Sequence, residues 1–394
     1  MKMKPKTKTK MKRTLLIIFI ISIISGINCK KNPVIPPDKP KDCYYPPGNR
    51  NFTWRIDTVA LFPSTLGGVW AFSDSDAYLM GNIFQWTNGV FTGYLGLHWN
   101  GKKWDTNING TVEEIKHVAN DVTGDDYYLV SVGNWSINPP KPALGEFDNR
   151  TKKWKGYQFQ TAGELRSVWT DGKGYFIAVG DNGMVYTKDG HSAGWVYTKA
   201  PTNFNLFRVK GVSKNEIYIL GYFTTNENVT YPQIWKYYNR NWIKLLDDLD
   251  TVGTYIKIPD NEHAIGDIYA HRCDITDSLQ LYIIGWESYL FKTKGNSLNY
   301  KGINLTYLGL PLRTMERTGL DINAFSPNDI WIFGTRYNFY HWNGLSFKRI
   351  IIPGLPNDDM HFGDQRKMIK TKSGKIFLPT EIASQVYVIA QGTP

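Results

Sequence analysis

Short apolar runs alternate with tight polar turns along most of the chain. Runs such as IYILG (217–221) and IWIFG (330–334) are hydrophobic almost throughout, as expected for strands covered on both faces. The turns before them, SKNE (213–216) and SPND (326–329), contain residue types that favour tight reversals. The pattern predicts short antiparallel strands joined by hairpins, with no long helices.

This pattern recurs along the chain. AFSDSDAYLMG (71–81) aligns without a gap with AFSPNDIWIFG (324–334), and GVSKNEIYILG (211–221) fits the same frame. Three looser copies end at Gly133, Gly180 and Gly285, so successive terminal glycines are 41 to 64 residues apart. Each copy is followed by a third strand and an outer strand. Four strands repeated at this period are typical of a β-propeller blade.

The predicted fold is therefore all-β: a seven-bladed β-propeller of four-stranded antiparallel blades, with six or eight blades as the alternatives. Six units cover about residues 66–355, and residues 367–392 supply three strands of a further blade. Residues 51–59 (NFTWRIDTV) have outer-strand character. We expect the N- and C-terminal strands to share one blade, because this closure removes free sheet edges.

The amino terminus is expected to be a leader rather than part of the fold. A basic segment precedes the apolar run Leu15–Ile27, which is too short to span a bilayer and fits a signal peptide. The predicted domains are a signal peptide (1–28), a Pro- and Lys-rich tether (29–50) and the propeller (51–394).

Cys29 directly follows the apolar run, in the sequence INCKK. This arrangement resembles a relaxed bacterial lipoprotein signal of the kind found in Bacteroidota and spirochaetes. The resemblance implies a lipidated Cys29 as the first mature residue and anchoring in the bacterial cell envelope, in the outer membrane. The alternative is ordinary secretion with an incidental thiol.

The formal charge of +11 belongs mostly to these terminal segments. Residues 51–394 contain 34 Lys and Arg against 33 Asp and Glu, so the domain is nearly neutral. The charge therefore gives no support for nucleic-acid binding.

Candidate sites for covalent, metal or cofactor chemistry are few. Cys43 and Cys273 can form a disulfide in an exported chain, or remain unpaired thiols. The acidic segments LLDDLD (245–250) and NDDMHFGD (357–364) lack EF-hand spacing and read as solvated loops. No motif for a phosphate, dinucleotide or serine-hydrolase site occurs. We predict no metal, no cofactor and no catalytic residue.

The tetrapeptide HWNG occurs at 98–101 and again at 341–344. In the repeat frame both copies fall on a third strand and the turn after it, on blades too far apart for the two histidines to share a ligand. We interpret each Asn-Gly as a turn and each tryptophan as a ring packed between blades.

The connections between second and third strands differ in length, and the longer ones are rich in aromatic residues. In a propeller these connections emerge on one face, and rigid rings suit recognition of a protein or glycan. The predicted ligand-binding residues are Trp86, Phe91, Tyr94, Trp135, Tyr222, Phe223 and Tyr231. The alternative is that these rings cap neighbouring blades.

The repeats resemble those of bacterial β-propeller lipoproteins with IWAVG and HWDG motifs. Residues 175–195 (YFIAVGDNGMVYTKDGHSAGW) also resemble propellers of the photosystem II assembly factor type and a degraded Asp-box. These resemblances imply a monomeric, lipid-anchored binding module without enzymatic activity. A sialidase-like or other glycan-acting hydrolase, with arginines such as Arg166, Arg208, Arg272, Arg313 and Arg336, is the alternative. A second alternative is an assembly factor for an envelope complex.

Overall fold

The computed structural model describes residues 45–108, 117–224, 230–247, 265–273, 279–285, 289–293, 300–304, 321–333, 339–355, 360–361, 367–382 and 386–394. The chain divides into two units, Met1–Asp42 and Cys43–Pro394, and every described residue belongs to the second. The leader, Cys29 and Cys43 lie outside the described residues. Within the described ranges, no helix has the length and apolar character needed to cross a membrane.

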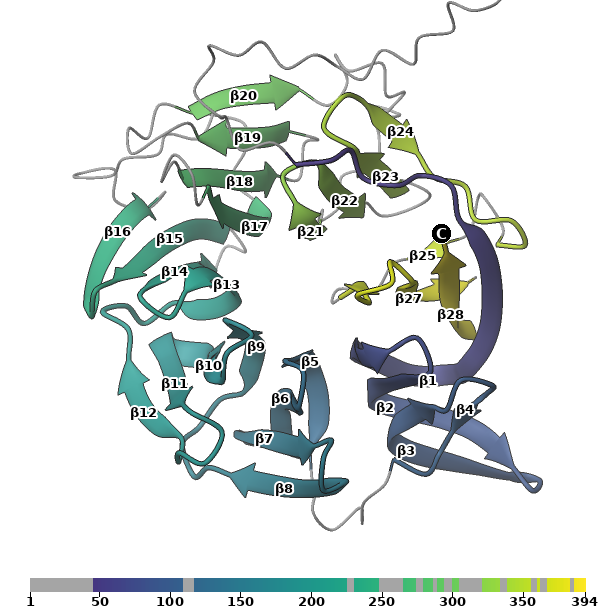
Figure 1. The fold of residues 1–394 in the computed structure, drawn as a ribbon. Helices are drawn as coiled ribbons and strands as arrows, with labels where there is room; N and C mark the ends of the chain where they lie inside the picture. Colours follow the sequence, from purple (N-terminus) through teal and green to yellow (C-terminus); the bar gives the residue numbers. More distant parts are fainter. Residues whose placement is uncertain are drawn as a thin grey trace, which may run out of the picture. The chain divides into compact units, whose positions relative to one another are not determined.

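The described residues form antiparallel sheets, most of them four-stranded and each built from four consecutive strands (Figure 1). The first sheet contains β5 (Val118–Gly124), β6 (Tyr128–Ile137), β7 (Pro140–Asp148) and β8 (Lys153–Gln158). The second contains β9 (Leu165–Thr170), β10 (Tyr175–Gly180), β11 (Met184–Asp189) and β12 (Val196–Lys199). The third sheet contains β13 (Asn205–Ser213), β14 (Glu216–Thr224), β15 (Thr230–Tyr238) and β16 (Asn241–Asp247). The fourth contains β17 (Ile265–Arg272), β18 (Leu279–Gly285), β19 (Tyr289–Thr293) and β20 (Tyr300–Asn304). The fifth is β21 (Asp321–Ser326), β22 (Asp329–Phe333), β23 (Phe339–Trp342), β24 (Phe347–Arg349).

The remaining sheet has eight strands and joins the two ends of the domain. It contains β1 (Thr53–Ser73), β2 (Asp76–Thr87), β3 (Val90–Trp99), β4 (Trp104–Asp105), β25 (Met360–His361), β26 (Ile369–Lys370), β27 (Ile376–Ile382) and β28 (Val386–Thr393). The first half of β1 pairs with β28, and its second half pairs with β2. In Figure 1 this long strand passes from the C-terminal strands to β2. The two ends of the domain therefore share a sheet, as the sequence predicts.

Second strands form the middle of the core. All six residues of β10 and all five of β22 are buried. Buried clusters join each sheet to the next: Phe147 and Trp154 pack with residues of β2, and Val130 and Val132 with residues of β9 and β10. Because each sheet covers the faces of its neighbours, the second strands are apolar on both sides.

The two ends of each sheet differ in their connections. Tight turns join the first strand to the second and the third to the fourth, at what we call the tight-turn end. The second strand joins the third at the opposite, hairpin end. Side chains link the tight turns of neighbouring sheets: Lys152 reaches Asp76 at 3.3 Å, and Lys214 reaches Asp189 at 3.1 Å. The tight-turn ends of successive sheets therefore lie side by side.

The long connections at the hairpin end are paired strands rather than open loops. β2 and β3 continue past the repeat glycine Gly81 to a two-residue turn at Asn88 and Gly89, both with positive φ. β6 and β7 are extended in the same way, and β14 pairs with β15 as far as Thr224 and Thr230. By contrast, β10 meets β11 through the single short turn η1 (Asp181–Gly183). The projections at the hairpin end are thus two-stranded and unequal.

Candidate functional site

A β-bulge recurs at one position of the first strand. In each case the residue before the bulge lies opposite a repeat glycine: Leu66 opposite Gly81, and Leu206 opposite Gly221. Three more first strands repeat this geometry, with bulges before Asp121, Ser167 and Asp267. A bulge adds one residue on one side of a ladder and re-aims the side chain that follows.

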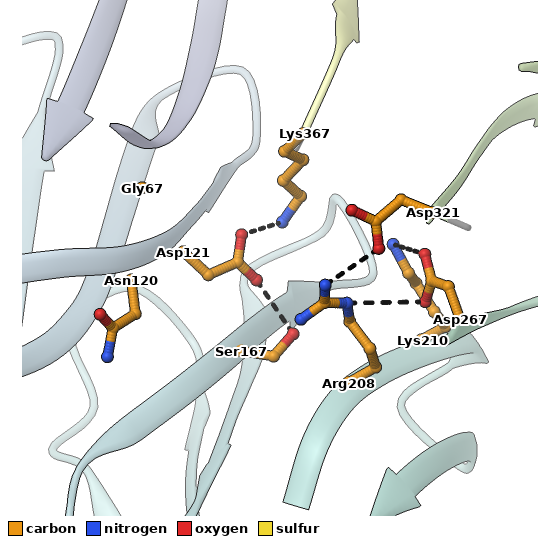
Figure 2. Close-up of a pocket in the computed structure, with 9 residues that line it drawn as sticks. All are labelled: Gly67, Asn120, Asp121, Ser167, Arg208, Lys210, Asp267, Asp321 and Lys367. Carbon is orange, nitrogen blue, oxygen red and sulfur yellow. Dashed lines mark hydrogen bonds and ion pairs between the residues drawn. The ribbon is translucent and has the colours of Figure 1, made fainter. Parts of the chain in front are cut away.

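The residues after these bulges converge on one cavity (Figure 2). Its polar side chains come from the first strands of successive sheets and from the segment before β26. We call them the charged cluster: Asp121, Ser167, Arg208, Lys210, Asp267, Asp321 and Lys367. Gly67 and Asn120 complete the lining. The bulge lies opposite the repeat glycine that ends the core of the second strand. The cluster therefore lies toward the hairpin end of the sheets.

Asp121 ties three chain segments together. The Ser167 hydroxyl and the Val168 backbone N–H both donate to its Oδ2 at 2.9 Å. Lys367 Nζ lies 3.2 Å from its Oδ1. Burial lowers the pKa of Lys367, and Asp121 offsets this only in part. The carboxylate thus links β5, β9 and the segment before β26.

Arg208 forms the other half of the cluster. Its Nη2 lies 3.0 Å from Asp321 Oδ1, and its Nε lies 3.9 Å from Asp267 Oδ1. Burial opposes the charge of Arg208, but Asp321 and Asp267 outweigh it and raise its pKa. Burial raises the pKa of Asp267, and Lys210 and Arg208 compensate only partly. The backbone N–H of Ile322 also donates to Asp267, at 3.2 Å.

The cavity has a volume of about 20 Å³, enough for about one water molecule. A sugar ring does not fit among these side chains. The arginines also do not form one clamp: Arg272 pairs with Glu216 at 2.7 Å at the tight-turn end, away from Arg166 and Arg208. Arg313 and Arg336 lie outside the described residues. In this arrangement the charged cluster links strands of different sheets.

The β2–β3 hairpin carries an exposed aromatic surface. Trp86 is 65% exposed and Phe91, directly opposite it, is 39% exposed. The Phe91 ring stacks on Phe84 at 5.4 Å. Tyr94 is partly buried and its hydroxyl donates to Thr87 at 2.8 Å. Trp86 and Phe91 therefore offer contact surface, while Tyr94 supports the hairpin.

The hairpins of two other sheets also carry aromatic residues. Trp135 sits at a bulge of β6, partly buried, and its Nε1 donates to the Phe159 carbonyl at 3.3 Å. Phe223 is 41% exposed and pairs with the partly buried Tyr231 across β14 and β15. Tyr222 instead lies near the charged cluster, with Arg208 and Asp267 as charged neighbours. Burial raises the pKa of its hydroxyl.

Two further exposed apolar residues at this end were not predicted from the sequence. Phe62 and Val90 are each 63% exposed. Val90 begins β3 beside the Asn-Gly turn, and Phe62 follows Leu61, which pairs with Phe84. Once the β2–β3 hairpin is recognised, the alternation of side chains between the two faces of a strand predicts that Val90 is exposed. The exposure of Phe62 depends on how β1 crosses between two halves of its sheet.

The two HWNG copies lie at equivalent turns, as predicted. Gly101 and Gly344 have φ of +87° and +88°. His98 and His341 each lie 2.8 Å from an aspartate at the start of the second strand, Asp76 and Asp329. His341 is fully buried and stacks on Trp331 at 4.2 Å. The histidines are therefore structural partners of a partly buried acid, Asp76, and of a buried one, Asp329, a role that their place in the repeat did not reveal.

Metal ligands do not gather in the part of the chain that the structure describes, where no group of three His, Cys, Asp or Glu side chains is placed to hold an ion. Of the two acidic segments, Asp248, Asp250, Asp358, Asp359 and Asp364 lie outside the described residues. Cys273 is buried and disulfide-bonded.

No protein-family model and no curated protein matches this sequence. Its fold is similar to that of YCF48 bound to a D1 peptide, with a TM-score of 0.57, 13% identity, and coverage of 89% of this chain and 100% of the other. The WD40 β-propeller domain of Doa1 gives a TM-score of 0.51 at 13% identity, covering 86% and 97%. The extracellular domain of a putative one-component system from B. thetaiotaomicron gives 0.53 at 11% identity, covering 85% of this chain and 40% of that one.

The antiparallel four-stranded sheets and these similarities define the fold as a β-propeller. At this level of identity the similarity concerns the fold alone.

Proposed function

We propose that this chain is a non-enzymatic recognition module that binds a protein or glycan at its hairpin end and is held at the bacterial envelope by a lipid on Cys29. The observation that carries the proposal is the exposed aromatic surface on projecting hairpins, Trp86 and Phe91 on one and Phe223 on another. Large exposed rings on rigid strands provide contact area at small entropic cost.

We further propose that the propeller has seven blades. The eight-stranded sheet supports this count if it is read as two blades that share β1, one of β1 to β4 and one of β26, β27, β28 and the first half of β1. Seven buried clusters, each between neighbouring blades of such a ring, also support it. In that frame each blade has one residue at the equivalent first-strand position: Gly68, Asp121, Ser167, Arg208, Asp267, Asp321 and Lys367.

A protein ligand is favoured over a glycan. The similar propeller YCF48 has a D1 peptide bound to it, and a propeller with unequal hairpins offers an uneven surface that suits a folded or extended polypeptide. Action as an assembly factor for an envelope complex is one form of such binding. The domain is proposed to act as a monomer.

The first described residues support the proposed anchoring. Tyr45 contacts His271 with its ring, at 4.9 Å between centroids, and the Gly48 N–H donates to the Asn328 carbonyl at 2.8 Å. Both partners lie at the tight-turn end of their sheets. The described chain therefore begins at the tight-turn end, opposite the hairpins that carry the proposed site. A similar bacterial fold is an extracellular domain, which agrees with an envelope location.

Binding is tested by replacing the exposed rings. The triple variant Trp86→Ala, Phe91→Ala, Phe223→Ala should lose at least about thirtyfold in affinity for a captured envelope protein or glycan, since buried aromatic anchors carry about 2 kcal/mol each. Its unfolding free energy should stay within about 1 kcal/mol of wild type. Immobilised protein is offered solubilised envelope proteins and released envelope glycans as separate probes.

The matched control is Tyr127→Ala, because Tyr127 is 50% exposed at the tight-turn end. Capture by the triple variant equal to that of wild type contradicts the hairpin site. Release of sugars from the glycan probe would instead support the hydrolase. For the anchor, mass spectrometry of the mature amino terminus decides: an unmodified Cys29 rules it out.

A further inference from the structure

A groove runs between the start of β1 and the outer strand β24, away from the hairpin end. Arg50, Phe52 and Trp54 line one side, and Lys348, Arg349 and Ile351 line the other. Its volume is about 540 Å³, within the range of small-molecule sites in proteins. We call it the basic groove, because the described residues that line it include three cationic side chains and no acidic one.

The charge of Arg50 is held in place by neutral acceptors. Its Nη1 donates to Ser346 Oγ at 3.0 Å and its Nη2 to the His341 carbonyl at 2.9 Å, and Nη2 also reaches the Ser346 carbonyl. None of these acceptors carries a negative charge. Burial lowers the pKa of Arg50, as expected where no carboxylate of the described residues offsets desolvation. The guanidinium is therefore fixed and its charge is available to an anion.

Lys348 adds a second cation on the facing strand. It is exposed on β24, two residues after Ser346, which binds Arg50. Trp54 is partly buried and its ring packs 5.7 Å from Phe52, while Ile351 is 56% exposed. The groove thus combines two cations with an apolar wall. That combination suits an anionic group attached to an organic body.

We propose that the basic groove binds a phosphate group, carried by an anionic lipid headgroup or by a soluble phosphate ester. A phosphate ester presents several oxygens and up to two charges near neutral pH, which match a fixed guanidinium and a mobile ammonium. The groove begins at Arg50, where the predicted tether ends. This site is separate from the hairpin end and does not depend on the function proposed for it.

The experiment uses the unlipidated chain from residue 30 to 394, which contains all the buried clusters. Inorganic phosphate, glycerol 3-phosphate and vesicles of phosphatidylglycerol or phosphatidylcholine are titrated separately by calorimetry or sedimentation. We expect Lys348→Glu to weaken binding of the phosphate probe at least about tenfold, because an attraction becomes a repulsion. Lys348→Arg should retain binding.

The matched control is Lys153→Glu, since Lys153 is also exposed on an outer strand, β8, and makes the same charge change. Melting curves confirm that both variants fold. Binding of soluble ester without vesicles assigns the site to soluble ligands, and binding only of phosphatidylglycerol vesicles assigns it to lipid. Equal loss in both variants, no binding of any phosphate probe, or equally tight binding of succinate would overturn the proposal.

Discussion

Acidic residues at the start of second strands hold neighbouring sheets together. Asp329 accepts from Trp331 Nε1 and lies 2.8 Å from His341, and Lys370 of the next strand set also contacts it. Glu216 lies 2.7 Å from both Lys236 of its own sheet and Arg272 of the next. These partners lower the pKa of Glu216 to about 2 despite burial, which acts to raise it. Glu216 is thus paired with one cation from its own third strand and one from the adjacent sheet, whereas Asp329 is paired with one cation, Lys370, and with His341, whose pKa burial lowers.

His117 shows the opposite kind of residue, a buried group kept neutral. It is 3% exposed, and its nearest polar partner is Ser131 Oγ at 3.1 Å. Burial lowers the pKa of His117 to about 4. As pH falls below about 6.5, His117 binds a proton in the unfolded chain but not in the folded one. The free energy of unfolding therefore decreases until about pH 4, where the folded chain also binds the proton.

We therefore expect His117→Gln to flatten the pH dependence of stability. Between pH 7 and pH 4.5 the unfolding free energy of wild type should fall by about 2 to 3 kcal/mol more than that of the variant. Each unit of pKa shift corresponds to about 1.4 kcal/mol. Urea unfolding at the two pH values measures this difference. Parallel loss of stability in both proteins would mean that His117 is protonated in the folded state.

At the scale of strands, the repeat glycines and polar turns predicted most of the sheets. The turns of both HWNG copies and the pairing of β1 with β28 follow from the pattern. The hairpin of β2 and β3 could also have been predicted, because Asn88-Gly89 is a strong signal for a two-residue turn. Interpreting every long connection as a loop hides that signal.

The charged cluster could not be predicted in the same way. Asp121, Arg208 and Asp267 are far apart in sequence and lie on strands that otherwise read as apolar or mixed. A bulge of one residue decides whether such a side chain faces the cavity or a neighbouring sheet, and that choice depends on tertiary packing. The pairing of His341 with Asp329 has the same origin, since it requires the register between β22 and β23.

Cys273 is disulfide-bonded, and the first described residue, Tyr45, lies close to it in the fold. Tyr45 contacts His271, and each of these residues is two positions from a cysteine, Cys43 or Cys273. We predict that the partner of Cys273 is Cys43. A non-reducing peptide map should contain the linked peptides, and Cys43→Ser should lower the unfolding free energy by about 2 to 4 kcal/mol. Cys29→Ser serves as the control, and a Cys29 to Cys273 linkage would contradict the assignment.

At the scale of the whole molecule, the charged cluster links the first strands of several described sheets. Arg208, Asp267 and Asp321 belong to three successive sheets, and Asp121 of β5 contacts Lys367, which precedes β26 of the eight-stranded sheet (Figure 2). Buried charges are costly when one partner is removed and much less so when the pair is removed together. The cluster should therefore behave as a unit.

Arg208→Leu should destabilise the domain by about 3 to 5 kcal/mol, because it leaves Asp267 and Asp321 buried without their guanidinium. Adding Asp321→Leu should restore about 1 to 2 kcal/mol, since one uncompensated carboxylate is then removed. Arg150→Leu breaks an exposed, solvent-screened pair with Asp148 and should leave the unfolding free energy close to that of wild type. Urea unfolding of the four proteins measures whether the double variant is more stable than Arg208→Leu. If the double variant were no more stable than Arg208→Leu, the carboxylates would be solvated independently, and the cluster would not link the sheets electrostatically.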